Sequence, residues 1–330
     1  MRKLLILLAI PYITIAQDIH FSSYYALQPE INPALAGFME GLYRGKVFYR
    51  HQWSNVPVPY NTVGLTLDGR FFVSGLRDAW IGSAISLYSD QAGDLRFGER
   101  YVSIMPSYTH SLDGENYFLG VGLALSYFWR TVDIANATTN SQWDGFQYNP
   151  DLPINEPDFG PVSAPNLSAG VFWAGKMDNL QLIIAGSLHN LIKPNVAFIT
   201  KEQRAIRTTV YSLARIYFNR QFSLLPMITI NYQRPASEYI VGLQFAYDLN
   251  PQWYSVNIFY AGILMRVNDA ITPVVRYRFK SIELSVAYDI TISELGSYAG
   301  RNAGPEVILS VMYPFDLPQS GVGSLSCPRF

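Results

Sequence analysis

Apolar and polar residues alternate along most of the chain after residue 45. The clearest example is 117–133, where large apolar residues occupy one side and mostly small residues the other. The apolar side carries Tyr117, Leu119, Val121, Leu123, Leu125, Tyr127 and Trp129. Alternation with period 2 predicts a β-strand with two different faces. An apolar face that has Tyr and Trp at its ends is typical of a strand facing lipid.

Comparable segments recur through the chain and together predict about fourteen strands. They are expected at 45–53, 62–68, 80–89, 98–110, 117–133, 163–174, 180–191, 208–218, 222–234, 239–249, 253–264, 269–279, 282–290 and 305–315. Most are roughly 9 to 13 residues long, which suits a tilted membrane-crossing strand, whereas soluble strands average about 5 or 6 residues. The predicted fold is all-β, an antiparallel transmembrane barrel at 45–315.

A soluble β-sandwich would also show alternation, so we use the lengths of the connections between strands to distinguish a sandwich from a barrel. Counted from the first hairpin, the even connections are mostly very short, at 175–179, 219–221, 250–252 and 280–281. The odd ones include all the long ones, at 134–162, 192–207 and 291–304. Short turns on one rim and long loops on the other are typical of an outer-membrane barrel. An even strand count then leaves both termini, including the tail 316–330, in the periplasm.

The residues before the first strand fall into two parts. Residues 1–16 have the form of a signal peptide, with Arg2 and Lys3 ahead of an apolar run and a small-residue cleavage site at Ala16. Residues 17–44, which we call the N-terminal segment, follow neither period and contain Pro29, Pro33 and Gly37, which favour turns over a long helix. We expect the N-terminal segment to plug the barrel lumen or to pack at its periplasmic mouth.

Composition narrows the function classes. The 330 residues carry a net charge of −1, which gives no electrostatic case for nucleic acid, and only 15% are charged while 15% are aromatic. A surface in contact with outer-membrane lipid would have this character. The single cysteine, Cys327, makes neither an intramolecular disulfide nor a metal site alone. His20, His51, His110 and His189 lack the spacing of a catalytic site, and no cofactor motif is present, so we expect no enzyme and no cofactor.

Charged residues on the small or polar side of the strands are expected inside the barrel. They are Arg50, Asp68, Arg130, Asp248, Arg276, Arg278, Glu283, Asp289 and Glu306. Such charges must be paired or hydrated, because an isolated ion in a closed lumen is costly. Arg276 and Arg278 should face Glu283 across a short turn. The set indicates either a cross-braced interior or a selective pore constriction. The bulky Phe48, Phe118 and Phe128 on the same side favour a closed interior.

The connection 134–162 combines acidic residues and prolines with the aromatic residues Trp143, Phe146, Tyr148 and Phe159. Exposed aromatic side chains on a stiffened loop suit protein recognition. A calcium loop and a disordered loop are the alternatives, although the spacing of an EF-hand is not found.

The stretch FSSYYALQPEINPALAG, followed by YRGKVFYRHQW, resembles the N-terminal signature of the PorP/SprF family. The matching residues include Asn32, Pro33, Ala34, Gly37, Tyr49, Arg50, Gln52 and Trp53. The resemblance implies an outer-membrane protein of the type IX secretion system and of gliding motility. It also implies an exported partner, often an adhesin-like surface protein held through its C-terminal sorting domain, and contacts with periplasmic, peptidoglycan-associated components. A passive channel or nutrient porin is the alternative, since the barrel alone would permit it.

Overall fold

A computed structural model describes residues 21–52, 59–73, 78–93, 95–134, 137–155, 160–250, 256–294, 296 and 302–313. The expected signal peptide 1–16 and tail 316–330, together with Trp53, Phe159 and Cys327, lie outside the described residues. In the described part, no helix is long and apolar enough to cross a membrane.

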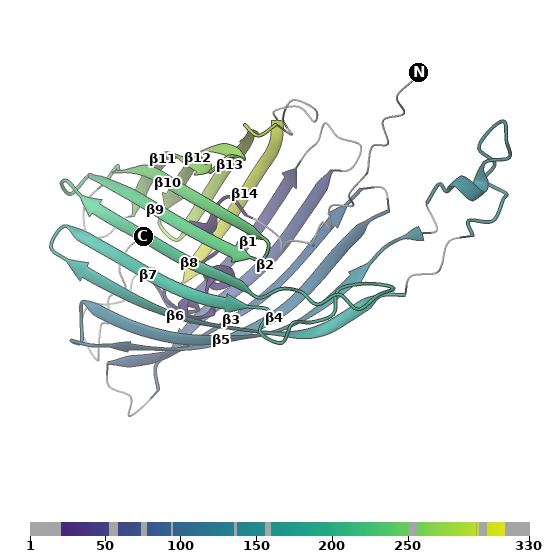
Figure 1. The fold of residues 1–330 in the computed structure, drawn as a ribbon. Coiled ribbons are helices and arrows are strands. Elements are labelled where there is room, and N and C mark those ends of the chain that lie inside the picture. Colours follow the sequence, from purple (N-terminus) through teal and green to yellow (C-terminus); the bar gives the residue numbers. More distant parts are fainter. Residues whose placement is uncertain are drawn as a thin grey trace, which may run out of the picture.

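Fourteen antiparallel strands form a closed barrel, in which β1 pairs with both β2 and β14 (Figure 1). The strands are β1 (Tyr43–Gln52), β2 (Tyr60–Phe71), β3 (Ala79–Ala92), β4 (Phe97–Ser111), β5 (Tyr117–Thr131), β6 (Val162–Met177), β7 (Leu180–His189), β8 (Arg207–Tyr217), β9 (Phe222–Gln233), β10 (Ala236–Asp248), β11 (Asn257–Arg266), β12 (Ala270–Phe279), β13 (Ile282–Thr291) and β14 (Asn302–Tyr313). The predicted fold class and strand number are confirmed.

The two faces of the strands differ as the alternation predicts. Val121 and Leu123 of β5 point outward and are 53% and 49% exposed, whereas Phe118 and Phe128 of the same strand are buried inside. Because the pleat sends successive side chains to opposite sides, the outer surface is a continuous apolar wall. Such a wall is stable against lipid and would be unfavourable in water.

Several strand ends differ from the pattern. Alternation ends the third strand at 89, yet β3 continues through Asp90 and Gln91, which pair with Glu99 and Gly98 of β4. Alternation begins the eleventh strand at 253, but β11 begins at Asn257. A stretch with polar residues on both faces resembles a turn in the sequence. A strand that extends beyond the lipid can nevertheless keep its hydrogen bonds to the neighbouring strand.

The long connections share one end of the barrel. This long-loop rim carries 132–161, 190–206 and 292–301, between β5 and β6, β7 and β8, and β13 and β14. The opposite end, the short-turn rim, carries turns such as 178–179, 218–221 and 280–281. In Figure 1 the β5–β6 connection extends furthest from the barrel.

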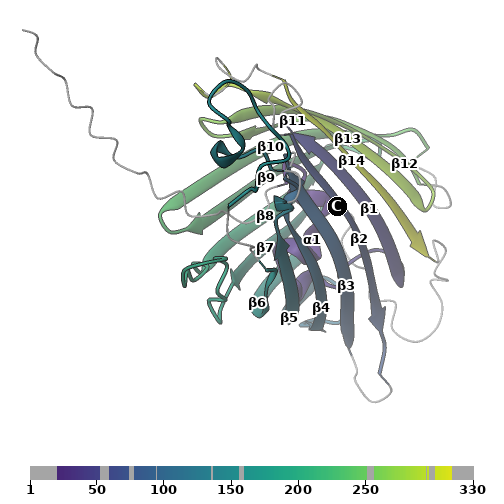
Figure 2. The ribbon, with the colours of Figure 1, turned by 90° about the vertical axis from the view of Figure 1, so that its right-hand side faces the viewer.

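The N-terminal segment lies inside the barrel rather than beside it (Figure 2). It consists of η1 (Tyr24–Ala26), α1 (Gln28–Ile31) and η2 (Pro33–Leu35). Its first described residues bond to Glu306 near the long-loop rim, and Leu42 bonds to Tyr313 at the short-turn rim. The segment therefore runs through the lumen from one rim to the other. The even number of strands, by which we placed the N-terminus in the periplasm, does not predict this path.

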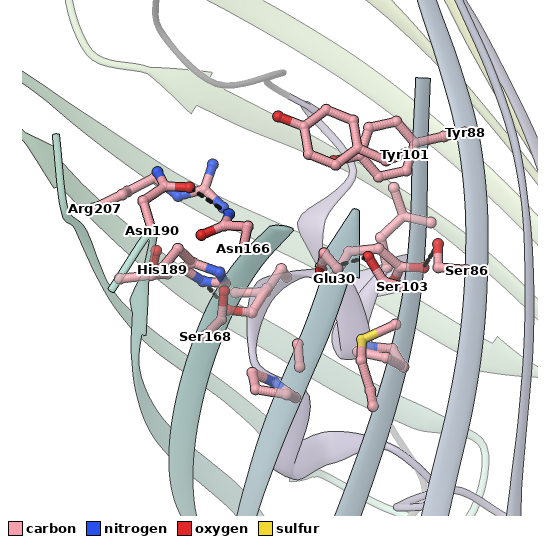
Figure 3. A pocket seen from close by; sticks show the side chains of 18 of the residues that line it. Glu30, Ser86, Tyr88, Tyr101, Ser103, Asn166, Ser168, His189, Asn190 and Arg207 are labelled. Atoms are coloured by element: carbon pink, nitrogen blue, oxygen red, sulfur yellow. Dashed lines mark hydrogen bonds between the residues drawn. The ribbon is translucent and has the colours of Figure 1, made fainter. Parts of the chain in front are cut away.

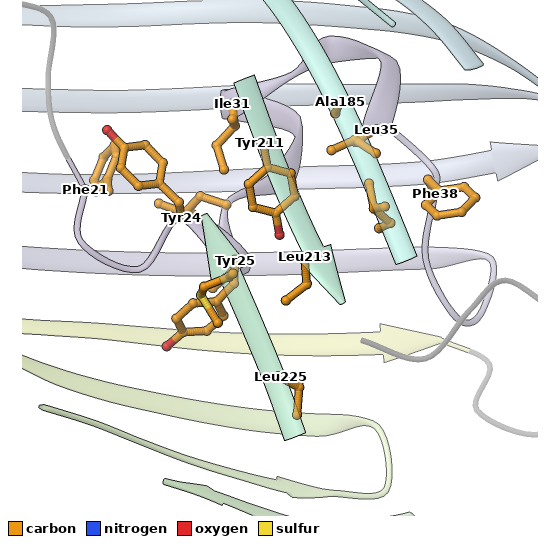
Figure 4. Close-up of a cluster of buried hydrophobic side chains, with 14 of the residues drawn as sticks. Phe21, Tyr24, Tyr25, Ile31, Leu35, Phe38, Ala185, Tyr211, Leu213 and Leu225 are labelled. Carbon is orange, nitrogen blue, oxygen red and sulfur yellow. The ribbon is translucent and has the colours of Figure 1, made fainter. Parts of the chain in front are cut away.

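The core of the protein sits between the N-terminal segment and the inner wall. Figure 4 shows Ile31 of the segment near Tyr211 of β8 and Leu35 beside Ala185 of β7, all members of one buried apolar cluster. Phe38 also stacks on Trp80, with ring centroids 6.3 Å apart, and packs against Phe172. Burial of these apolar surfaces fixes the segment in the lumen.

Candidate functional site

The main chain of the N-terminal segment rests directly on glycines of the barrel wall. A Cβ atom on Gly82 would lie 2.0 Å from the oxygen of Ala36, and one on Gly122 would lie 2.5 Å from the nitrogen of Ala34. Only a residue without a side chain allows such an approach. The main chain at Ala34 and Ala36 thus fits closely against the wall because the facing wall residues, Gly122 and Gly82, have no side chain.

Asn32 attaches the N-terminal segment to β6 and β7. Its Nδ2 donates to the main-chain oxygens of Val171, at 3.0 Å, and Gly186, at 2.9 Å, which are partners in the β6–β7 ladder. Its Oδ1 accepts from the N–H of Ala34 at 2.9 Å and so caps η2. Gly170 makes room for this amide, since a Cβ there would lie 2.0 Å from Oδ1.

Two further signature residues shape the same part of the chain. Pro33 occupies the first position of η2, where its missing N–H costs nothing. Gly37 has a φ of +69°, and a Cβ on it would lie 2.6 Å from the oxygen of Gly69. Both the conformation and the close contact require glycine there.

The strand residues of the signature have different roles. Tyr49 faces outward and is 44% exposed, with its hydroxyl donating to Asn61 at 3.3 Å. Arg50 is buried, and Gln52 at the end of β1 is half-buried.

Arg50 belongs to a charge cluster around the first described residues of the N-terminal segment. Its guanidinium lies 2.8 Å from Asp289 and 3.6 Å from Glu306. The N–H groups of Ser22 and Ser23 donate to the two oxygens of Glu306 at 3.0 and 2.9 Å. The sequence predicts these three charges inside the barrel, and the structure shows that they hold the N-terminal segment as well as one another.

A second cluster lies toward the short-turn rim. Arg276 and Glu283 are paired at 3.2 Å, as expected across the β12–β13 turn. Arg278 forms its ion pair with Glu40 of the N-terminal segment. Asp68 pairs with Arg44 at 2.7 Å. In this cluster too, the N-terminal segment takes part, because its Glu40 is the partner of Arg278.

Arg130 belongs to a third cluster, at the long-loop rim. Its Nε donates to Glu99 at 2.6 Å, and its Nη1 donates to the main-chain oxygen of Val196 at 2.7 Å. Arg204 pairs with the same carboxylate, and its guanidinium lies 5.0 Å from the ring centre of Phe128. The β7–β8 connection is thereby fixed over the inner wall of β4 and β5.

Asp248 is separate from these clusters. It is half-buried at the end of β10 and accepts from the N–H of Asn250 at 3.0 Å, which shapes the following turn. The expected set of lumen charges thus includes Asp248, which is peripheral, and omits Arg44, Lys46, Glu99 and Arg204. Lys46 and Glu99 could have been found from the sequence, because strand alternation places both of them on the inward face.

His189 contacts a serine, an arrangement that could suggest catalysis. Its Nε2 lies 3.0 Å from Ser187 Oγ, but both groups also contact the main-chain oxygen of Ile31, at 2.9 and 2.6 Å. A hydroxyl that donates to a carbonyl is held in place rather than activated. The pair anchors the N-terminal segment.

A polar cavity of about 90 Å³ remains between α1 and the inner wall (Figure 3). Glu30 reaches toward Ser86 on one side, while Asn166, His189 and Arg207 line the other. This volume holds a few water molecules, each of which needs about 10–15 Å³ by this measure.

The connection between β5 and β6 forms a hairpin over 137–155 that projects from the rim. Trp143 and Tyr148 face each other in a β-bridge, and the main-chain oxygen of Gln142 closes the base by accepting from the N–H of Asn149 at 2.8 Å. Asp144 accepts from the N–H groups of Gln147 and Phe146, each at 2.8 Å, and these bonds lower its pKa.

The aromatic side chains of this hairpin are exposed. Phe146 is 94% exposed at the tip, Trp143 is 57% exposed and Tyr148 is 45% exposed. The described residues 137–155 contain turns, a short 3-10 helix and one isolated β-bridge. Exposed aromatic groups on a stiff support bind with a small loss of conformational entropy.

Comparison with known families gives the chain its place. A family model described as type IX secretion system membrane protein PorP/SprF matches residues 13–309. The chain belongs to the PorP/SprF family. It is therefore an outer-membrane β-barrel of type IX secretion. No curated protein matches the sequence.

Solved structures similar to this PorP/SprF protein are other outer-membrane barrels. A TodX deltaS2S3 mutant monoaromatic hydrocarbon channel has a TM-score of 0.51 at 11% identity, over 85% of this chain and 92% of that one. A FadL homologue from Pseudomonas aeruginosa has a TM-score of 0.50 at 12% identity, over 86% and 93%. At such identities the likeness extends to the fold alone.

Proposed function

We propose that this PorP/SprF protein retains or helps to export a secreted surface protein, which it contacts at the long-loop rim. The supporting observation is the projecting hairpin 137–155 with its exposed aromatic tip. Trp143, Phe146 and Tyr148 are the proposed contact residues, together with Phe159 further along the same connection. Buried aromatic side chains commonly supply much of the binding energy at protein interfaces.

The orientation of the barrel is part of the proposal. Outer-membrane barrels place long loops outside the cell and short turns in the periplasm. The long-loop rim would then meet the exported partner, an adhesin-like protein recognised through its C-terminal sorting domain. The short-turn rim would contact periplasmic, peptidoglycan-associated components of the secretion machinery.

The N-terminal segment favours an anchoring role over that of a passive channel or nutrient porin. A porin needs an open polar path, whereas here the segment, its apolar contacts and three charge clusters occupy the lumen. The arginines of these clusters are paired with carboxylates of the wall and of the N-terminal segment, which supports the cross-braced interior rather than a selective constriction.

Retention of the exported partner on whole cells tests this proposal. Replacing Trp143, Phe146 and Tyr148 with Ser should release the partner, because the recognition surface is lost while no strand pairing changes. Heat-dependent mobility on gels serves as the folding control. A matched triple variant on the lipid-facing wall, Val121, Leu123 and Leu125 to Ala, should keep the partner. Unchanged retention in the Ser variant would remove the hairpin from the site.

A further inference from the structure

A second cavity, of about 60 Å³, lies between the N-terminal segment and the wall at the short-turn rim. It adjoins the β12–β13 turn, where the N–H of Met312 donates to the oxygen of Ser281 at 2.8 Å. Its charged lining consists of Arg44, Lys46, Arg276, Arg278, Glu40 and Glu283. We call it the basic cavity. It shares no lining residue with the cavity around Glu30, and neither cavity belongs to the hairpin of the proposed function.

The three guanidinium groups of the basic cavity each have a carboxylate partner. These ion pairs are Arg44–Asp68, Arg276–Glu283 and Arg278–Glu40. Each arginine carries five N–H donors, which is more than a single carboxylate can accept. The Nε of Arg276, for example, has no hydrogen-bond partner among the described residues.

Lys46 is the fourth cation, and it lacks such a partner. The residue is only 3% exposed, and its ammonium donates to the main-chain oxygen of Ala26. Among the described residues no carboxylate lies within ion-pair distance of it. Taking an ammonium out of water without a counter-charge is unfavourable.

Glu30 is a neighbouring carboxylate, and only one of its two oxygens accepts a hydrogen bond among the described residues. Its Oε1 accepts from Thr66 and Ser86. Thr66 is the cross-strand partner of Lys46, so the carboxylate is a neighbour of the ammonium without forming an ion pair with it. The basic cavity therefore combines one ammonium outside any ion pair with three guanidinium groups and the carboxylates of Glu40 and Glu283.

We propose that the basic cavity binds one oxyanion group, a carboxylate or a phosphate, with Lys46 as its main ligand. The ammonium supplies the charge, and the neighbouring guanidinium groups supply N–H donors of suitable geometry. A volume that holds a few water molecules admits a single such group rather than a larger ligand. The site faces the short-turn rim, so its ligand arrives from the side opposite the aromatic hairpin.

Thermal unfolding of the full protein in detergent tests the site with inorganic phosphate as the probe. At equal ionic strength, phosphate should raise the unfolding temperature above that in chloride, because it binds only the folded state. Lys46→Met should abolish this rise, whereas Lys176→Met, at the exposed end of β6, should keep it. An identical unfolding temperature in phosphate, acetate and chloride for the unchanged protein would overturn the proposal. A parallel series with acetate distinguishes a carboxylate ligand from a phosphate ligand.

A second variant keeps the test decisive if Lys46→Met fails to fold. Ser310 lines the basic cavity and is the β14 partner of Lys46 across the β1–β14 pairing. Ser310→Asp places a carboxylate where the anion should bind, so it should unfold at a higher temperature than Ser310→Asn and should no longer respond to phosphate. Lower stability of Ser310→Asp than of Ser310→Asn would contradict an anion site.

Discussion

The side-chain amide of Asn32 donates a 2.9 Å hydrogen bond to the main-chain oxygen of Gly186, which fixes the N-terminal segment to the ladder between β6 and β7. The same amide also serves Val171 and Ala34, so each of its polar atoms is used. Asn32 thereby positions the N-terminal segment and caps the start of η2.

Replacing Asn32 with Asp should destabilise the folded barrel. A carboxylate has the same size but cannot donate to the oxygens of Val171 and Gly186, and each unsatisfied buried group costs about 1–3 kcal/mol. Urea unfolding in detergent measures the change. Asn32→Asp as stable as the unchanged protein would show that these hydrogen bonds do not hold the N-terminal segment.

Two neighbouring wall glycines give a matched comparison. Gly170→Ala should loosen the N-terminal segment, because the added carbon would lie 2.0 Å from Asn32 Oδ1. Gly186→Ala should be tolerated, since no atom lies within 4 Å of its Cβ position. Protease sensitivity of the N-terminal segment in folded protein reports the difference. Equal sensitivity of the two variants would argue against close contact of this segment with the wall.

The inward and outward faces of β5 provide a third test. Leu123→Arg, facing lipid, should cost about 2–4 kcal/mol near the middle of the membrane. Ser126→Arg, facing the lumen beside the polar cavity, should be better tolerated. The folded fraction after insertion into lipid vesicles measures both. If the two variants folded equally well, the assignment of the faces would be wrong.

Alternation predicted the strands and their faces well, because each depends on residues two positions apart. The pairing of Arg276 with Glu283 was equally accessible, since one short turn separates them. Arg278 shows the limit of such reasoning. Its partner Glu40 is 238 positions away, and only the path of the N-terminal segment through the lumen brings them together.

The same limit applies to the candidate sites. The composition of 134–162 identified Trp143, Phe146 and Tyr148, although the turn that presents them depends on hydrogen bonds of Asp144 and Gln142. Alternation places Lys46 on the inward face, but whether it forms an ion pair depends on the position of Glu30 of the N-terminal segment. The N-terminal segment shows no periodic alternation, so a local sequence pattern does not predict which parts of the barrel wall it contacts.

Conductance of the purified protein in planar lipid bilayers tests most directly whether this barrel is a closed support rather than a channel. The filled lumen predicts little steady conductance for the full protein. A variant lacking residues 21–38, which leaves the strands intact, should conduct strongly if its barrel closes, and so shows that an emptied lumen is detectable. Large, stable, ohmic channels from the full protein would contradict the closed lumen and would favour a porin.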